Sequence, residues 1–160
     1  MSRVARSARV ASRQRPEIIT ESKTIQTAET GELFLINYNE AANITLTLPS
    51  VQDGAYFRFQ FMQALSATTG SVTISSADGA GSMKGTMWNM GYSASSNDVP
   101  NSTNKDNSST SIFFSGSSLL GNSTIEKTHV GSYVDIYCDG SNWYASGVCI
   151  GGHLSQSVFI

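Results

Sequence analysis

The sequence has few charged residues and no long apolar run. Charged side chains make up 14% of its 160 residues, well below the roughly 25% that is usual in globular domains. No segment approaches the roughly 20 consecutive apolar residues of a membrane-spanning helix. The N-terminal arginines are not followed by the apolar stretch of a secretory signal. We therefore expect a soluble chain that is made in a cytoplasm and has no membrane partner.

Motifs of known catalytic or metal-binding chemistry are also missing. The two histidines, His129 and His153, show none of the spacings that are typical of zinc ligands. There is no G-x-S-x-G motif to indicate a nucleophile, and the acidic residues are scattered singly rather than paired as in glycosidases. Glycines 79, 81 and 85 are not followed by the Lys-Ser/Thr of a phosphate-binding loop. The sequence predicts no catalytic residue, no metal, no cofactor and no enzymatic activity.

The cysteines are limited to Cys138 and Cys149. A turn at residues 139–142 would place Cys138 opposite Trp143 in a hairpin. Cys149 then lies six residues further along the second strand, a distance of roughly 20 Å at about 3.3 Å per residue. Because a disulfide needs Cα atoms within about 7 Å, we expect two buried free thiols.

The sequence shows a hydrophobic period of two, which is typical of β-strands. Residues 43–48 alternate polar and apolar side chains up to Pro49, and Phe57, Phe59 and Phe61 share one face of a strand at 56–61. The same reading predicts strands at 31–38 (apolar on both faces, as in a strand buried between two layers), 72–75, 111–114, 131–138 and 143–149. We expect an all-β protein with about eight to ten strands, as a jelly-roll-like fold or a two-sheet β-sandwich.

Residues 17–160 are predicted to form a single β domain that contains one long polar segment. Fifteen of the 22 residues at 89–110 are Asn, Asp, Ser or Thr, so we expect a loop there. Long loops are usually either functional or mobile. The loop is thus either a mobile surface excursion or a contact loop that reaches a neighbouring molecule.

Residues 1–16 are predicted to form a basic N-terminal arm. The arm holds five of the ten basic residues and no acid, so the rest of the chain has 12 acids against five bases and a net charge of −7. The arm contains too few apolar residues to bury a core of its own. We expect its arginines to bind a partner. These arginines are Arg3, Arg6, Arg9, Arg13 and Arg15.

Three kinds of partner are consistent with this arm. Nucleic-acid phosphates would attract five arginines, but the arm has no aromatic residues to stack on bases and the body is acidic. An acidic membrane surface would call for a larger apolar face. A neighbouring protein subunit, contacted through arginine–carboxylate pairs or an added strand, is the reading that we favour.

Two segments resemble a known class of proteins. Residues 31–62, GELFLINYNEAANITLTLPSVQDGAYFRFQFM, and residues 131–147, GSYVDIYCDGSNWYASG, are similar to β-rich modules of tailed-phage virion proteins. Such modules occur in head decoration (cement) proteins and in tail-fibre segments. Together the two segments cover about a third of the chain.

The resemblance implies a structural role in a virion. The length and the arm favour a decoration protein on the outer capsid surface. Its partners would be the major capsid protein and further copies of itself. We expect the homo-oligomer to be a trimer. The alternative is a tail-fibre or baseplate tip subunit that binds a host receptor or glycan. Exposed aromatic residues would then serve as oligomer or partner contacts. The candidates are Tyr92, Phe113, Phe114 and Phe159.

Overall fold

The computed structural model defines most of the predicted β domain. It describes residues 16–38, 40, 42–65, 70–77, 83–90, 101–109, 111–115 and 128–150, with backbone alone at 89, 101–109 and 115. The five arginines of the arm lie outside the described residues, as do Tyr92 and Phe159. Within the described ranges, no helix has the length and apolar character needed to cross a membrane.

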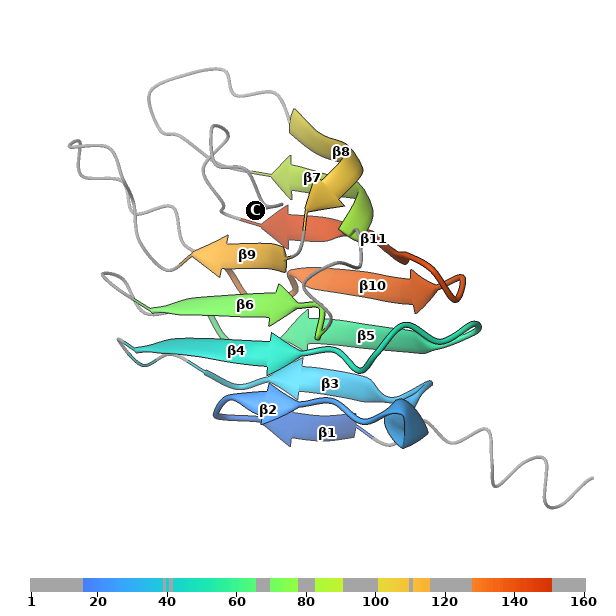
Figure 1. Ribbon diagram of the computed structural model, residues 1–160. Coiled ribbons are helices and arrows are strands. Elements are labelled where there is room, and N and C mark those ends of the chain that lie inside the picture. The colour runs from blue at the N-terminus through green and yellow to red at the C-terminus, as the bar shows by residue number, and fades with distance from the viewer. Residues whose placement is uncertain are drawn as a thin grey trace, which may run out of the picture.

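The described chain forms two packed β-sheets, as Figure 1 shows. The seven-stranded sheet has the order β1 (Pro16–Ile19), β3 (Leu33–Ile36), β5 (Tyr56–Phe61), β10 (Tyr133–Cys138), β11 (Trp143–Ile150), β7 (Met83–Met90), β8 (Asn101–Ser109). The four-stranded sheet has the order β2 (Lys23–Thr24), β4 (Asn43–Thr47), β6 (Ser71–Ser75), β9 (Ser111–Ser115). A short 3-10 turn, η1 (Thr27–Glu29), follows β2. The expected two-sheet β-sandwich is confirmed.

The first six strands wind back and forth between the two sheets. Odd-numbered strands β1, β3 and β5 lie parallel in the larger sheet, and β2, β4 and β6 lie parallel in the smaller one. Each turn of the chain therefore adds one strand to each layer (Figure 1). Of the later strands, β9 and β10 pair antiparallel with β6 and β5, and β11 pairs antiparallel with β10 but parallel with β7. This parallel winding differs from the antiparallel strands of a jelly roll.

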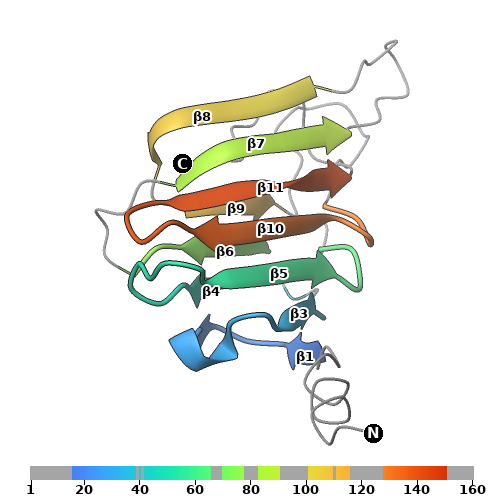
Figure 2. The same ribbon diagram turned by 90° about the vertical axis from the view of Figure 1, so that its right-hand side faces the viewer.

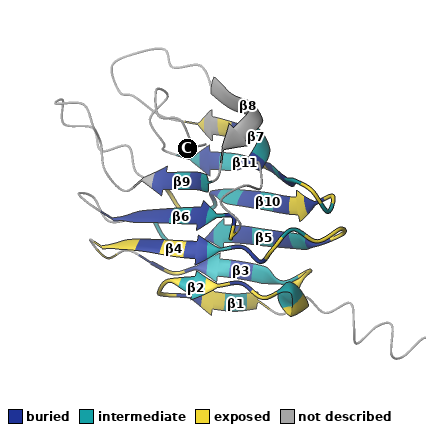
Figure 3. Cartoon of the chain, viewed as in Figure 1, coloured by how far each residue is buried: buried dark blue, intermediate teal, exposed yellow. Residues whose placement is uncertain are grey.

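The core lies between the two sheets and is rich in aromatic side chains. Alternate residues of β5 point into it, so that Phe57, Phe59 and Phe61 are buried as the period-two pattern predicts. Phe34 stacks on Phe59 with ring centroids 5.1 Å apart. Burial is concentrated in the central strands, and exposure increases toward β1 and β2 (Figure 3).

The hairpin of β10 and β11 forms as predicted. Cys138 pairs with Trp143, and the Asp139 carboxylate closes the turn by accepting the backbone N–H groups of Ser141 and Asn142 at 2.8 and 2.7 Å. Both Cys138 and Cys149 are buried free thiols, which confirms that part of the prediction.

The predicted loop at 89–110 is wrong over much of its length. β7 extends to Met90, and residues 101–109 form β8, which pairs antiparallel with β7. Strand pairing uses backbone N–H and C=O groups, so a polar sequence can form an edge strand. Residues 91–100 and 110 lie outside the described residues.

The prediction that residues 31–38 are buried on both faces is also wrong. In β3, Phe34 and Ile36 are buried, whereas Leu33 and Leu35 are only partly covered. The reason is that the second sheet packs on one side of β3 alone. The other side belongs to a face of the larger sheet on which no described strand packs.

Candidate interaction surface

The outer face of the seven-stranded sheet is a broad surface of the described protein. Figure 2 shows this sheet in front, with the four-stranded sheet behind it and no described strand crossing its outer face. Side chains alternate along each strand, and directly paired residues of neighbouring strands share a face. The strand register therefore identifies the outward-facing residues.

One line of paired residues crosses six strands of this face and is almost entirely apolar. Five of its six members are aliphatic or aromatic, with a single glutamine. We call this line the apolar row. It consists of Ile18, Leu35, Gln60, Tyr133, Val148 and Trp88 on β1, β3, β5, β10, β11 and β7.

The two ends of the apolar row are the most open to solvent. Ile18 is 56% exposed and Trp88 is 51% exposed. Tyr133 and Val148, which lie between these two ends, are partly shielded by their neighbours. The pair Ile150 and Met90 continues the apolar surface one step further along β11 and β7, and Met90 is also exposed. Contiguous exposed apolar side chains often mark a contact surface.

The next row across the sheet carries an ion pair within the chain. Arg58 Nε lies 3.5 Å from Asp135 Oδ1, close enough for an ion pair although no hydrogen bond forms. The Arg58 guanidinium also lies over the ring of Tyr133, 4.8 Å from its centroid. The Tyr56 hydroxyl donates to Asp135 at 2.7 Å, and burial together with this hydrogen bond raises the pKa of Tyr56. The two central charges of the face are therefore paired with each other within one chain.

A stacked pair of tyrosines lies at the hairpin end of the face. Tyr137 and Tyr144 are paired across β10 and β11, with ring centroids 5.0 Å apart and planes at 16°. The Tyr144 hydroxyl donates to the Asp139 carboxylate at 2.9 Å. The backbone N–H groups of Asn142 and Ser141 hold the pKa of Asp139 below its usual value. Asp139 therefore stays ionised at neutral pH.

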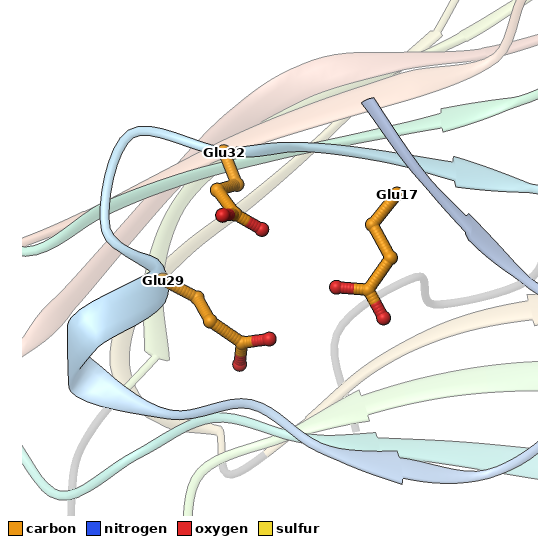
Figure 4. Close-up of side chains that lie close together, drawn as sticks. All are labelled: Glu17, Glu29 and Glu32. Carbon is orange, nitrogen blue, oxygen red and sulfur yellow. The ribbon is translucent and has the colours of Figure 1, made fainter. Parts of the chain in front are cut away.

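A second grouping, three glutamates near the edge of the sandwich, has the composition of a cation site. Glu17, Glu29 and Glu32 have carboxylate oxygens within 4.8 Å of one another (Figure 4). The ammonium of Lys23 binds both Glu17 and Glu29 at 2.5 Å and lies 5.2 Å from the centroid of Phe34. A metal ion would therefore compete with a cation that belongs to the chain itself.

The contacts of this cluster indicate a structural role. Glu29 also accepts the backbone N–H of Gln26 at 2.5 Å, which completes a capping box at η1. Burial alone would lower the pKa of Lys23, but its hydrogen bonds to Glu17 and Glu29 outweigh that effect and raise it. Burial would likewise raise the pKa of Glu29, yet the Gln26 N–H and the Lys23 ammonium hold it below its usual value. The cluster joins β1, β2 and η1 where the two sheets meet.

Of the residues predicted as partner contacts, the structure describes Phe113 and Phe114. Phe114 is fully buried and packs on Phe61 across the sheets, so its assignment as a contact residue is wrong. The period-two pattern of β9 turns Phe114 inward and leaves its neighbour Phe113 partly exposed on the other side of the smaller sheet. Tyr92, Phe159 and the arm arginines lie outside the described residues.

The outer face of the larger sheet was not identified from the sequence. Two features of the sequence are consistent with this face. Leu33 and Leu35 are apolar, although the pattern predicts that they are buried between two layers. Val148 alternates with the buried Gly147 and Cys149. Alternation identifies two faces of a strand but does not tell which of them a second sheet will cover.

Comparison of the chain with models of protein families, with curated proteins and with solved structures gave no match in any of the three.

Proposed function

We propose that this protein is a non-enzymatic structural subunit of a virion that binds the outer surface of a tailed-phage capsid. There it would contact the major capsid protein and stabilise the joints between capsomers as a homo-oligomer. The observation that supports an assembly role best is the outer face of the seven-stranded sheet. This face presents a row of apolar side chains and an ion pair that is neutralised internally.

The β body and the arm have separate tasks in this proposal. The body has an aromatic core and supplies an apolar surface for contact with other subunits. The arm supplies five arginines, which pair well with carboxylates in bidentate geometry. A subunit that binds at two or three points gains avidity well beyond that of each contact alone. This gain would hold a small protein on a shell that is under internal pressure.

Binding to emptied phage heads tests the role of the arm. In the test variant, all five arginines at positions 3, 6, 9, 13 and 15 are replaced by glutamine in the full-length chain. We expect the wild type to co-sediment with the heads and the variant to lose binding at least tenfold. Glu21→Gln, a change of one charge at an exposed position between β1 and β2, serves as the control and should bind normally. Equal binding by the wild type and the five-fold variant would refute the arm's role.

The location of the protein in the particle tests the capsid assignment. An electron-microscopy map of the virion should show the two-layer body on the outside of the shell, over the joints between capsomers. Density for the body inside the shell or on the tail would refute the assignment.

A receptor- or glycan-binding tip is the second candidate, and the tyrosine pair at the hairpin end favours it. Tyr137 is 52% exposed, and Tyr144 holds the carboxylate of Asp139 beside it. Aromatic rings next to a carboxylate are suited to sugar hydroxyls and ring faces. Clear hits on a glycan array that disappear in Tyr137→Ala, without binding to emptied heads, would favour this function over capsid decoration.

A further inference from the structure

We infer that the outer face of the seven-stranded sheet binds the same face of a second copy of this chain, forming a two-fold dimer centred on the apolar row. This inference deepens the proposed function, since it names the surface that joins the copies and the symmetry of the pair. It replaces the expected trimer with a dimer as the basic unit.

The size of the face is suited to a stable interface. The six strands lie about 4.8 Å apart and average about six residues in length. Their backbone therefore covers roughly 24 by 20 Å, without counting the area of the projecting side chains. A protein–protein interface of standard size buries about 800 Å² on each partner. The face is thus of the same order as one side of such an interface. Five of the six side chains in the apolar row are apolar, with Gln60 as the exception.

The charges of the face favour a copy of itself over a partner with a complementary charge. Arg58 and Asp135 neutralise each other within one chain, and Arg58 is further stabilised by the ring of Tyr133. A second copy brings the same internally paired charges, so the two faces can approach without unpaired like charges at their centre. Interfaces between identical subunits are correspondingly richer in apolar area than transient ones.

Sheet geometry permits this contact. Two twisted sheets pack face to face at about 10 Å with their strands within about 30° of one another. A surface that packs on itself generates two-fold symmetry. Whenever one residue of the first copy contacts another residue of the second copy, the reciprocal contact also forms. Gln60 and Tyr133 lie on the two central strands of the apolar row, near the axis, with Val148 beside Tyr133, and Ile18 and Trp88 lie at its two ends. No described strand covers the outer face, and a second copy would supply the third layer.

The test measures mass and tryptophan accessibility in the same samples of full-length protein. By analytical ultracentrifugation we expect the wild type to sediment as a dimer at micromolar concentration, with a mass that 0.5 M salt leaves unchanged. Val148→Lys should weaken the dimer at least tenfold. Thr45→Lys, an equivalent change at an exposed position of β4, should leave it intact.

Fluorescence quenching provides a readout that needs no variant. Of the two tryptophans, Trp143 is buried in the core and Trp88 is half exposed. Acrylamide should therefore quench Trp88 more strongly as the protein is diluted and the dimer dissociates. Trp88→Phe should abolish this dependence on concentration.

Several results would overturn the inference. These are a monomeric or trimeric wild type, quenching that is independent of concentration, and a dimer that Val148→Lys leaves unchanged. Binding to emptied phage heads distinguishes a failure of this inference from a failure of the proposed function. A monomer that still binds heads refutes the dimer alone, and a dimer that never binds heads refutes capsid decoration alone.

Discussion

Phe61 and Phe114 belong to different sheets, and their ring centroids lie 4.9 Å apart with planes tilted by 57°. Both side chains are fully buried, so this contact is part of what holds the two layers together. Tilted aromatic pairs of this kind contribute beyond the burial of their area.

Phe114→Ala should therefore destabilise the protein by about 3–5 kcal/mol, because it removes a buried ring and leaves a cavity. Chemical denaturation followed by circular dichroism measures this change. Phe113→Ala is the matched control, since Phe113 lies next to it on the outer side of β9 and is only partly buried. A larger loss for Phe113→Ala than for Phe114→Ala would mean that the register of β9 is reversed.

Lys23→Met should destabilise the protein by about 1 kcal/mol at neutral pH, since it leaves Glu17 and Glu29 without their cation. The folded-state pKa of Glu29 is lowered, so the stability that Glu29 contributes is present above about pH 4.5 and is lost as the pH falls through the folded-state pKa. The difference between wild type and Lys23→Met should therefore shrink below pH 4.5.

Urea unfolding of both proteins between pH 3 and pH 7 measures this effect. Lys84→Met replaces a lysine outside the cluster, and the difference between wild type and Lys84→Met should not shrink in the same way. A difference between wild type and Lys23→Met that stays constant down to pH 3 would contradict the assigned ion pairs.

Gly147→Ala should destabilise the protein by about 1–3 kcal/mol or more through crowding. A Cβ atom at this position would lie 2.2 Å from the backbone oxygen of Tyr133 and 2.8 Å from the Cα of Val134. Neither atom can move without shifting β10. Thermal unfolding measures the loss.

Gly31→Ala separates this crowding from the effect of backbone conformation. Gly31 has a φ of +86°, but a Cβ there would meet nothing within 4 Å. Its substitution should cost only the strain of a left-handed residue, about 1 kcal/mol. Equal losses for the two variants would contradict the close approach of β10 and β11.

Neither thiol should react with Ellman's reagent in the folded protein, and both should react in denaturant, because Cys138 and Cys149 are 2% and 3% exposed and unbridged. The assay should give no rapid phase in buffer and two equivalents in 6 M guanidinium. One rapid equivalent in buffer would show that one of these sites is open to solvent.

The fold class could be predicted from the sequence because burial in a sandwich leaves a period of two. The alternation at Phe57, Phe59 and Phe61 appears directly as the inner side of β5. The turn at Asp139 was equally clear, since a short turn between two alternating segments produces a hairpin.

The arrangement of the strands could not be predicted in the same way. Parallel pairing of β1 with β3 and of β2 with β4 depends on contacts between segments that local patterns do not connect. The polar strand β8 was missed for a related reason, since its pairing with β7 relies on backbone groups that every residue type shares.

The candidate surface was the least predictable part. An outward apolar residue such as Val148 gives the same pattern as one in a doubly covered strand. Only the position of the second sheet shows that Val148 faces away from the core.

The winding of the first six strands has a consequence for how the chain reaches its native state. Leu35 follows its strand partner Ile18 by 17 residues, and Gln60 follows Leu35 by 25, whereas Tyr133 follows its partner Gln60 by 73. Closing a loop costs more entropy as the loop lengthens, and proteins with many distant contacts fold more slowly. We therefore expect β1 to β6 to form first, turn by turn, as the chain leaves the ribosome. β10 and β11 complete the sheet last, so the outer face that we propose for assembly exists only after the final step of folding.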